Sequence, residues 1–170
     1  MEHTEILVFL PPEQLQEKVK GIFEKERQII KKHFPDVDVQ NVGSTAIPGA
    51  MGKFDIDIQI RVTQEQFSDV MDWMREGCFA AKNTDCWTEQ YGLFRNEENY
   101  IDYNVTVIDS KHDIFHHIRD YLIEHPAVLQ KYMELKMSFQ GKTYGDYRSV
   151  RHKFFQRIRK RIRKLKNLSQ

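Results

Sequence analysis

A chain of 170 residues, 40% of them hydrophobic and 30% charged, is long enough to bury roughly two-thirds of its unfolded surface, so we expect one domain over residues 1–170. The apolar patch at residues 6–10 is too short for a secretory signal, and no apolar run approaches the roughly 18 residues of a membrane span. Cys78 and Cys86 match no zinc or disulfide pattern and are expected to be reduced thiols. These features exclude a membrane partner and favour a cytoplasmic protein.

The net charge of +1 hides a strong asymmetry along the chain. Residues 147–170 contain ten Lys/Arg and no acid, which leaves sixteen Lys/Arg against twenty-five Asp/Glu in residues 1–146. An acidic body argues against broad non-specific binding of nucleic acid, because such binding needs a basic face. The carboxyl-terminal segment alone provides such a face.

Apolar periodicity predicts alternating helices and strands in the first half of the chain. Helices are expected where apolar residues recur every three or four positions, and strands where they alternate. In chain order we predict a helix at 15–33, a strand at 37–42, a short helix or loop at 46–52, a strand at 54–62 and a helix at 64–76.

The second half begins with an irregular stretch at 79–91, for which only loops and short extended pieces are expected. Strands at 91–96 and 100–108 follow, then helices at 113–124, 126–139 and 147–165. This succession predicts an α+β fold, an α/β sandwich with a mixed sheet covered mainly on one side. We expect an α/β core at about 1–110, carboxyl-terminal helices at about 111–166 and a tail at 167–170.

Two carboxylates stand one residue apart in the predicted strand at 54–62, ten residues after a Gly43-Ser44 turn. The strand period of two places Asp55 and Asp57 on one face, where their mutual repulsion favours a cation between them. Gly43 lets the backbone approach a phosphate closely, and Ser44 can donate to its oxygens. The spacing therefore predicts Mg²⁺ beside a phosphate.

A third carboxylate, Asp102, lies on the strand predicted at 100–108, opposite to that strand's apolar face. If this strand neighbours the one with Asp55 and Asp57, the three acids form a ligand set for one or two Mg²⁺ ions. Such ions hold a triphosphate and stabilise displacement at its α-phosphorus. The alternative is that all three acids are ordinary exposed strand residues.

The segment VGSTAIPGAMGKFDIDI, residues 42–58, resembles the GrpB family, and its Gly-Ser turn with Asp-x-Asp resembles the polymerase-β-like nucleotidyltransferase superfamily. The resemblance covers about residues 5–160. The chain departs from the family pattern at Phe54, where proline is usual, and on the strand where many members carry histidines. Further matching positions are His117 to Leu122, His125-Pro126, Tyr132, Leu135-Lys136, Tyr147 and Lys153-Phe154.

The resemblance implies a nucleotidyltransferase-like fold that binds a nucleoside triphosphate with Mg²⁺ and transfers a nucleotidyl group to an unknown acceptor, with no organic cofactor. In that chemistry Asp55, Asp57 and Asp102 would be the catalytic metal ligands. Charged side chains and turn residues would bind the phosphates. The candidates are Gly43, Ser44, Thr45, Lys53, Arg95, Arg119 and Lys136, with Thr45 rather shaping the turn.

Several of these residues have simpler interpretations. Arg119 beside Asp120 can be a structural ion pair, Lys136 a surface helix charge, and Lys53 a residue that tempers the two aspartates. His112 and His116 have the i, i+4 spacing of a zinc pair, but no third ligand accompanies them.

The last predicted helix carries an apolar stripe expected to dock on the body, flanked by basic residues. These basic residues are either a solvated face that attracts the acidic body or a patch for RNA or nucleotide phosphates. A non-catalytic nucleotide- or RNA-binding module is therefore the alternative function. The stripe consists of Val150, Phe154, Ile158, Ile162 and Leu165, and the basic residues are Arg148, Arg151, Lys153, Arg157, Arg159, Lys160, Arg161, Arg163 and Lys164.

Overall fold

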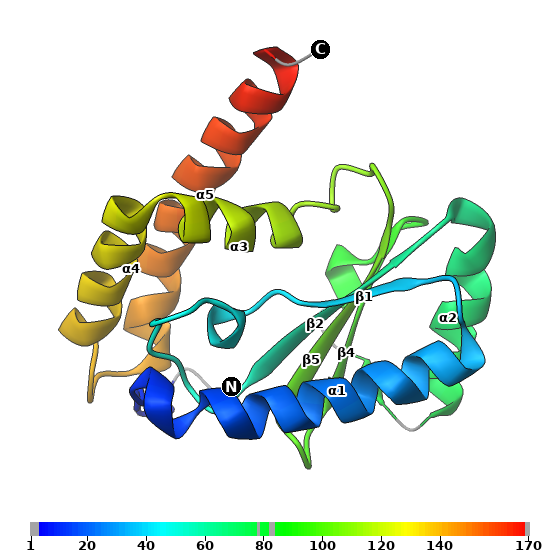
Figure 1. Cartoon of the computed structure of the whole chain (residues 1–170), viewed down its shortest axis with the longest axis horizontal. Coiled ribbons are helices and arrows are strands. Elements are labelled where there is room, and N and C mark those ends of the chain that lie inside the picture. Colours follow the sequence, from blue (N-terminus) through cyan, green and yellow to red (C-terminus); the bar gives the residue numbers. More distant parts are fainter. Residues whose placement is uncertain (1–3, 78, 82–83, 169–170) are drawn as a thin grey trace.

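A computed structural model describes residues 4–77, 79–81 and 84–168; Cys78 and the tail residues 169–170 lie outside the described residues. Helices and strands occur in the predicted order (Figure 1). They are α1 (Gln16–His33), β1 (Asp38–Asn41), β2 (Ile56–Val62), α2 (Gln64–Glu76), β3 (Ala80–Ala81), β4 (Tyr91–Asn96), β5 (Ile101–Val107), α3 (Phe115–Glu124), α4 (Pro126–Ser138) and α5 (Tyr144–Leu168), with 3₁₀ turns at Pro12–Gln14, Ser44–Ala46 and Thr84–Cys86.

The sheet has the strand order β1-β2-β5-β4-β3. Its two central strands, β2 and β5, run parallel, and the other neighbouring pairs are antiparallel. A parallel pair needs a long crossover connection, and the chain between β2 and β5 provides it with α2, β3 and β4. The predicted α+β fold with a mixed sheet and a carboxyl-terminal helical part is confirmed.

The element boundaries differ from the predicted ones in a few places. β2 begins at Ile56, two residues late, and the short strand β3 occupies part of the segment predicted as loop. α5 begins three residues early, because the Thr143 hydroxyl accepts a hydrogen bond from the backbone N–H of Asp146 and donates to its carboxylate at 2.7 Å.

One face of the sheet carries the main apolar core. The isoleucines of β2 alternate inward and pack with buried residues of α1 and α2, among them Val19, Ile30, Val70 and Met74. Helix α2 begins with a capping box between Thr63 and Gln66, which satisfies its first free N–H groups. The core therefore lies mainly on one side of the sheet, as predicted.

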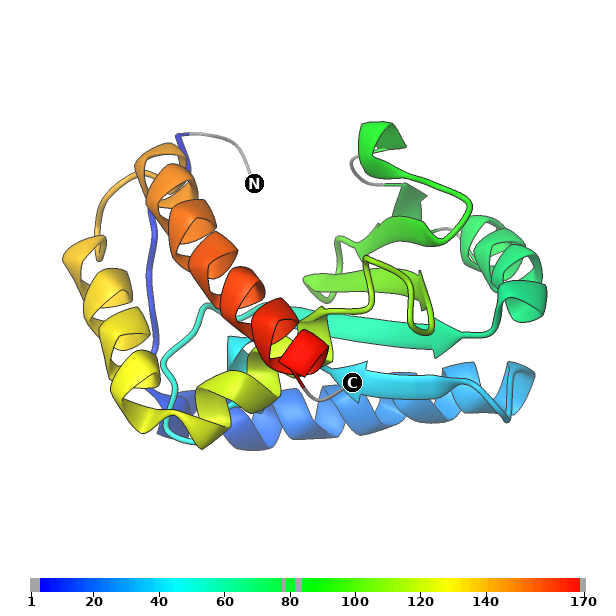
Figure 2. The same cartoon turned by 90° about the horizontal axis from the view of Figure 1, so that it is seen from above.

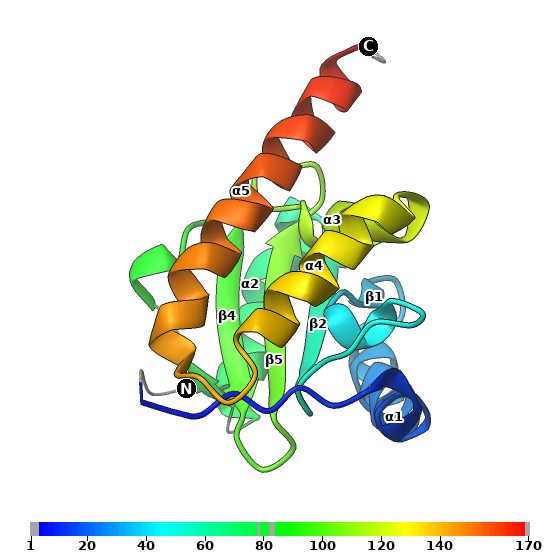
Figure 3. The same ribbon diagram turned by 90° about the vertical axis from the view of Figure 1, so that its left-hand side faces the viewer.

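The helices α3, α4 and α5 gather around a second apolar cluster beside the sheet (Figure 2). Ile158 and Ile162 of α5 are buried in this cluster, whereas Val150 and Leu165 of the predicted stripe are exposed, so only the middle of the stripe docks. The end of α5 extends beyond the rest of the molecule (Figure 3). Within the described ranges, no helix combines the length and the apolar character that crossing a membrane requires.

Candidate functional site

The Gly43-Ser44 turn lies directly against the first residues of β2. The Val42 N–H donates to the Asp57 carbonyl at 2.8 Å, and a Cβ on Gly43 would overlap Oδ2 of Asp57. The backbone conformation of Gly43 is an ordinary extended one. Glycine is favoured here by the close approach of the Asp57 side chain rather than by backbone conformation. The turn and the Asp57 carboxylate therefore form one unit, with Ser44 at the start of the 3₁₀ turn that follows.

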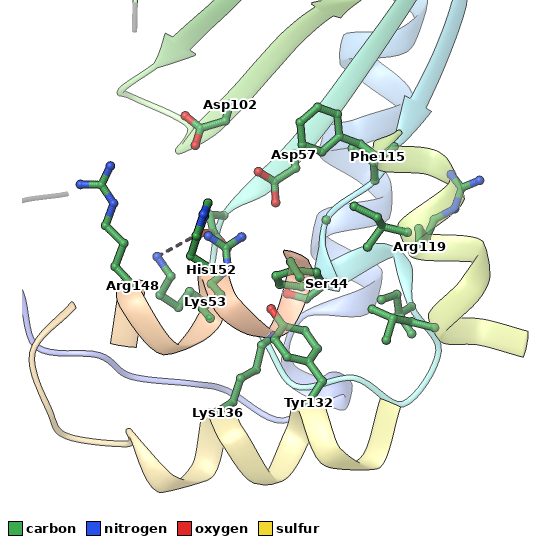
Figure 4. Close-up of a pocket in the computed structure, with 18 of the residues that line it drawn as sticks. Ser44, Lys53, Asp57, Asp102, Phe115, Arg119, Tyr132, Lys136, Arg148 and His152 are labelled. Atoms are coloured by element: carbon green, nitrogen blue, oxygen red, sulfur yellow. Dashed lines mark ion pairs between the residues drawn. The ribbon is translucent and has the colours of Figure 1, made fainter. Parts of the chain in front are cut away.

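The carboxylates of two neighbouring strands face the same space. Asp57 on β2 is the register partner of Asp102 on β5, and both side chains enter a cleft (Figure 4). Asp55, just before β2, also lines this cleft, and its Oδ2 lies 3.0 Å from the Lys53 ammonium. Asp57 and Asp102 are therefore neighbours as expected, whereas Asp55 lies outside β2 and pairs with Lys53, so the described residues do not form the expected ligand set of three acids.

The carboxylate oxygens on this side of the cleft, called the acidic wall below, are ligands that suit a hard cation. No group of three His, Cys, Asp or Glu side chains close enough to hold a metal ion occurs in the part of the chain that the structure describes. Mg²⁺ is commonly bound by only one or two carboxylates together with phosphate oxygens of the substrate. Asp57 and Asp102 are the two carboxylates that the strand register places side by side.

The cleft has a volume of about 440 Å³, within the range of small-molecule sites. Of the residues that the structure describes, six Lys/Arg and three Asp line it, so its walls attract an anion. The acids stand on the sheet side, and three of the cations come from α5. The charged lining residues are Lys53, Asp55, Asp57, Asp102, Arg119, Lys136, Arg148, Arg151 and Arg159.

Helix α5 contributes the residues that were not singled out from the sequence as site residues. Arg148, Arg151 and Arg159 line the cleft together with His152, and they recur at intervals that place them on one side of a helix. Arg148 and His152 lie near Lys53 in Figure 4. The helical spacing was visible in the sequence, but the side that faces the cleft depends on how Ile158 and Ile162 dock α5.

Arg95 is placed behind the acidic wall. Its guanidinium is 8% exposed, contacts the Asp102 carboxylate at 3.0 Å and the Glu97 carboxylate at 2.8 Å, and is not among the described residues that line the cleft. Burial alone lowers the pKa of Arg95, but the two carboxylates outweigh it and raise that pKa. Arg95 therefore neutralises Asp102 in this structure.

Arg119 lines the cleft, whereas Thr45 is not among the described residues that line it. The Arg119 guanidinium donates to the Asp120 carboxylate at 2.8 Å and to the Asn41 carbonyl at 2.9 Å, and it points away from Asp57 (Figure 4). These contacts are those of the structural ion pair that was the simpler interpretation. The buried hydroxyl of Thr45 has no hydrogen-bond partner among the described residues.

Lys136 lies at the bottom of the cleft, beneath Ser44 in Figure 4. It is 2% exposed, so the interpretation as a surface helix charge is wrong. Its ammonium donates to the Met51 carbonyl at 2.6 Å. The sequence pattern of α4 did not indicate this burial, because its apolar residues are not confined to one face.

A buried polar network joins the start of α3 to the sheet. The Asp113 carboxylate accepts two hydrogen bonds from Arg61, both at 2.8 Å, and one from Gln59 at 3.1 Å. Burial alone raises the pKa of Asp113, but Arg61 outweighs it and holds that pKa below its usual value. His116 donates its backbone N–H to Gln59 at 3.1 Å. The network fixes α3 over the polar face of the sheet.

His116 belongs to this network rather than to a zinc pair. Burial, reinforced by the charges of His117 and Arg61, lowers the pKa of His116 to about 4, so the ring is neutral at neutral pH. Its Nδ1 lies 3.3 Å from both Gln59 and Asp113. His112 stacks on Tyr91 with 4.6 Å between the ring centres.

The sequence profile of the family described as GrpB protein matches residues 13–161. A relative in Vibrio cholerae, the UPF0157 protein VC_A0354, is 24% identical over 151 residues, which cover 88% of this chain and 80% of the relative. The crystal structure of conserved protein GrpB from Enterococcus faecalis has a TM-score of 0.75 and 21% identity, covering 96% of this chain and 100% of that one. This likeness shows a common fold.

A structure of the Cid1 poly(U) polymerase with MgGTP bound overlaps with the chain more weakly. The TM-score is 0.48 at 11% identity, over 70% of this chain and 39% of that one. An overlap of this size carries no conclusion about activity.

Proposed function

Since the chain belongs to the GrpB family, whose profile matches residues 13–161, we propose that it binds a nucleoside triphosphate with Mg²⁺ in this cleft and transfers a nucleotidyl group to an acceptor. The observation that carries the proposal is the register pair Asp57 and Asp102, which opens onto a cleft with a cationic far wall. A cleft lined by acids alone would repel a polyphosphate. A cleft that binds anions through its cations alone would have no use for two adjacent carboxylates.

In this proposal Asp57 and Asp102 hold the cation and Asp55, just before β2, supports them. When bound, Mg²⁺ neutralises charge on the phosphate oxygens. Ser44 and the backbone at Gly43 donate to the phosphates, since the turn lies against Asp57. Arg148 and Arg151 offset negative charge on the departing pyrophosphate from the opposite wall.

Lys53 has a second role in the proposal. Its ammonium lies 3.0 Å from the Asp55 carboxylate and 5.5 Å from the centre of the Tyr144 ring. It therefore stands between the acids and α5, where it can exchange a carboxylate oxygen for a phosphate oxygen at little cost. Arg95 and Arg119 are assigned no direct contact with the ligand, because their guanidinium groups are already held by protein oxygens.

Thermal unfolding with each of the four common nucleoside triphosphates, with and without Mg²⁺, tests the proposal. Ligand at 100 times Kd adds about 2.7 kcal/mol. For a chain of this size we expect a rise in Tm of roughly 5 to 10 °C that needs Mg²⁺. Asp55→Ala/Asp57→Ala should abolish the rise, and Asp36→Ala/Asp69→Ala, which removes two exposed acids, should retain it.

A rise that persists in Asp55→Ala/Asp57→Ala, or the absence of any rise with all four triphosphates, would contradict a metal-dependent nucleotide site. A rise without turnover on any acceptor would support the non-catalytic alternative.

RNA binding by α5 is a second candidate function, favoured by one observation. The part of α5 that extends beyond the body carries exposed basic side chains and no acid (Figure 3). Binding through this face should weaken steeply with salt and be lost in Lys160→Glu/Lys164→Glu, whereas nucleotide binding in the cleft should survive these substitutions. Filter binding of a short single-stranded RNA at two salt concentrations measures the difference.

A further inference from the structure

The bottom of the cleft contains a buried cation without a carboxylate partner. Lys136 is 2% exposed, and its ammonium contacts the Met51 carbonyl and lies 4.6 Å from the centre of the Tyr132 ring. Among the described residues, no carboxylate oxygen comes within ion-pair distance of Lys136. A carbonyl and a ring face compensate an ammonium only in part, so burial at this position disfavours the charged form.

A second cation and two hydroxyl groups surround the same point. Arg151 of α5 lines the cleft, and the hydroxyl of Tyr147 donates to that of Tyr132 over 3.5 Å. All four side chains line the cleft, although they come from two different helices. Figure 4 shows Tyr132 and Lys136 side by side at the end of the cleft beyond Ser44, away from Asp102.

The charges in this group favour a nearby negative charge. Burial lowers the pKa of Lys136. Burial alone would raise the pKa of Tyr132, yet the charges of Lys136 and Arg151 outweigh it and lower that pKa. Lys136 and Arg151 thus leave an excess of positive charge that lowers the pKa of Tyr132, whereas the lowered pKa of Lys136 reflects its burial.

We infer that Lys136, Arg151, Tyr132 and Tyr147 form a pocket for the terminal phosphoryl group of the ligand, which binds there without a metal ion. A phosphoryl dianion accepts hydrogen bonds from an ammonium, a guanidinium and hydroxyl groups at once, and it removes the excess charge. The inference deepens the proposed function and rests on it for the remainder of the ligand. It makes triphosphates preferred over monophosphates.

The position of the pocket sets the direction of the ligand. Asp57 and Asp102 stand at one end of the cleft and Tyr132 and Lys136 at the other, with Ser44 between them (Figure 4). A polyphosphate chain whose terminal group occupies the pocket therefore passes the turn before it reaches Asp57. The nucleoside then lies on the side of Asp57 and Phe115, which is an aromatic residue of the same lining.

Calorimetric titration of the whole chain with inorganic tripolyphosphate in EDTA tests the pocket without metal and without a nucleoside. We expect binding to the wild type, about tenfold or more weaker binding to Lys136→Met, and a loss of roughly three- to tenfold for Tyr132→Phe. Lys131→Met removes an exposed lysine from the same helix and should bind like the wild type. Tyr132→Phe removes only a hydroxyl, so it reports on the pocket even if Lys136→Met unfolds.

Comparing ligands with phosphate chains of different length distinguishes a structural role of Lys136 from a role in ligand recognition. Loss of the pocket should weaken the binding of nucleoside triphosphates in Mg²⁺ but not the binding of nucleoside monophosphates. A general distortion of the cleft should weaken the binding of both. Equal tripolyphosphate affinity in the wild type, Lys136→Met and Tyr132→Phe overturns the inference. So does a wild type that binds Mg²⁺-triphosphate through Asp57 but does not bind tripolyphosphate in EDTA.

The two proposals fail in different ways. If tripolyphosphate binds and depends on Lys136, while Asp55→Ala/Asp57→Ala has no effect on nucleotides, the pocket stands and the metal-dependent function falls. If nucleotide binding needs Mg²⁺ and Asp57 but not Lys136 or Tyr132, the reverse holds.

Discussion

The two faces of the central sheet differ in what they contribute to the protein. One face holds isoleucines that alternate along β2 and pack against α1 and α2. The other face presents Asp57, Gln59 and Arg61 on β2 beside Asp102, Asn104 and Thr106 on β5. The first face is closed by apolar contacts and supplies stability, while the second is held by hydrogen bonds and opens into the cleft. Folding and ligand binding should therefore respond to separate substitutions.

Ile58→Ala is expected to have the largest effect, because Ile58 is completely buried in the apolar face. Removing such a side chain costs about 2 to 5 kcal/mol of unfolding free energy. Urea unfolding measures this loss, with Ile29→Ala on the partly exposed side of α1 as the control. A folded Ile58→Ala protein should bind ligands in the cleft as the wild type does; a loss of affinity would show that the two faces are coupled.

The polar face should make stability depend on pH through His116, whose folded pKa is about 4 against 6.5 when unfolded. Between these values the unfolded chain binds a proton that the folded chain does not, so stability is full above about pH 6.5 and falls toward pH 4. We expect a loss of about 2 kcal/mol between pH 7 and pH 4.5. Below this window, protonation of Asp113 and Asp38, whose pKa values are lowered by Arg61, removes further stability.

Chemical unfolding of the wild type, His116→Gln and His33→Gln at pH 7, 5.5 and 4.5 measures this dependence. His116→Gln should flatten the decline, and His33→Gln, at an exposed position of α1, should not. Parallel curves for all three proteins would contradict this, because they would show that folding does not change the pKa of His116.

Gly43→Ala should have the smallest effect on folding and a selective effect on the cleft. The added Cβ would overlap Oδ2 of Asp57, so the carboxylate has to move. We expect a loss of about 1 kcal/mol in stability. Mg²⁺-dependent nucleotide affinity should fall roughly tenfold, and tripolyphosphate binding in EDTA, which does not use the Asp57 carboxylate, should fall less. Gly21→Ala, where a Cβ meets nothing within 4 Å, is the matched control.

Local sequence patterns were sufficient to predict the helices and strands, but not the contacts between them. The alternation in β5 and the periodicity of α2 depend on consecutive residues, and both elements were predicted correctly. That Asp102 neighbours Asp57 was a conditional expectation, because strand pairing depends on residues 45 positions apart. The strand pattern indicated this pair, and the GrpB resemblance agreed with it.

The cations that line the cleft could not be predicted from local sequence either. The basic residues of α5 were recognised as a group, but their division between cleft and solvent depends on where Ile158 and Ile162 dock. The burial of Lys136 has no local signal at all, since it results from the packing of α4 against Met51 and Phe9. Asp113 was likewise given no special role, because its partner Arg61 lies on another element.

A single continuous helix, α5, carries Arg148, Arg151 and Arg159 along the cleft. The three guanidinium groups share one backbone, so a small rotation of α5 moves all of them together relative to Asp57. Substitutions at Ile158 or Ile162, which touch no ligand, therefore tune the whole wall at once. The packing of the apolar residues of α5 therefore sets the position of the positive charge in the cleft.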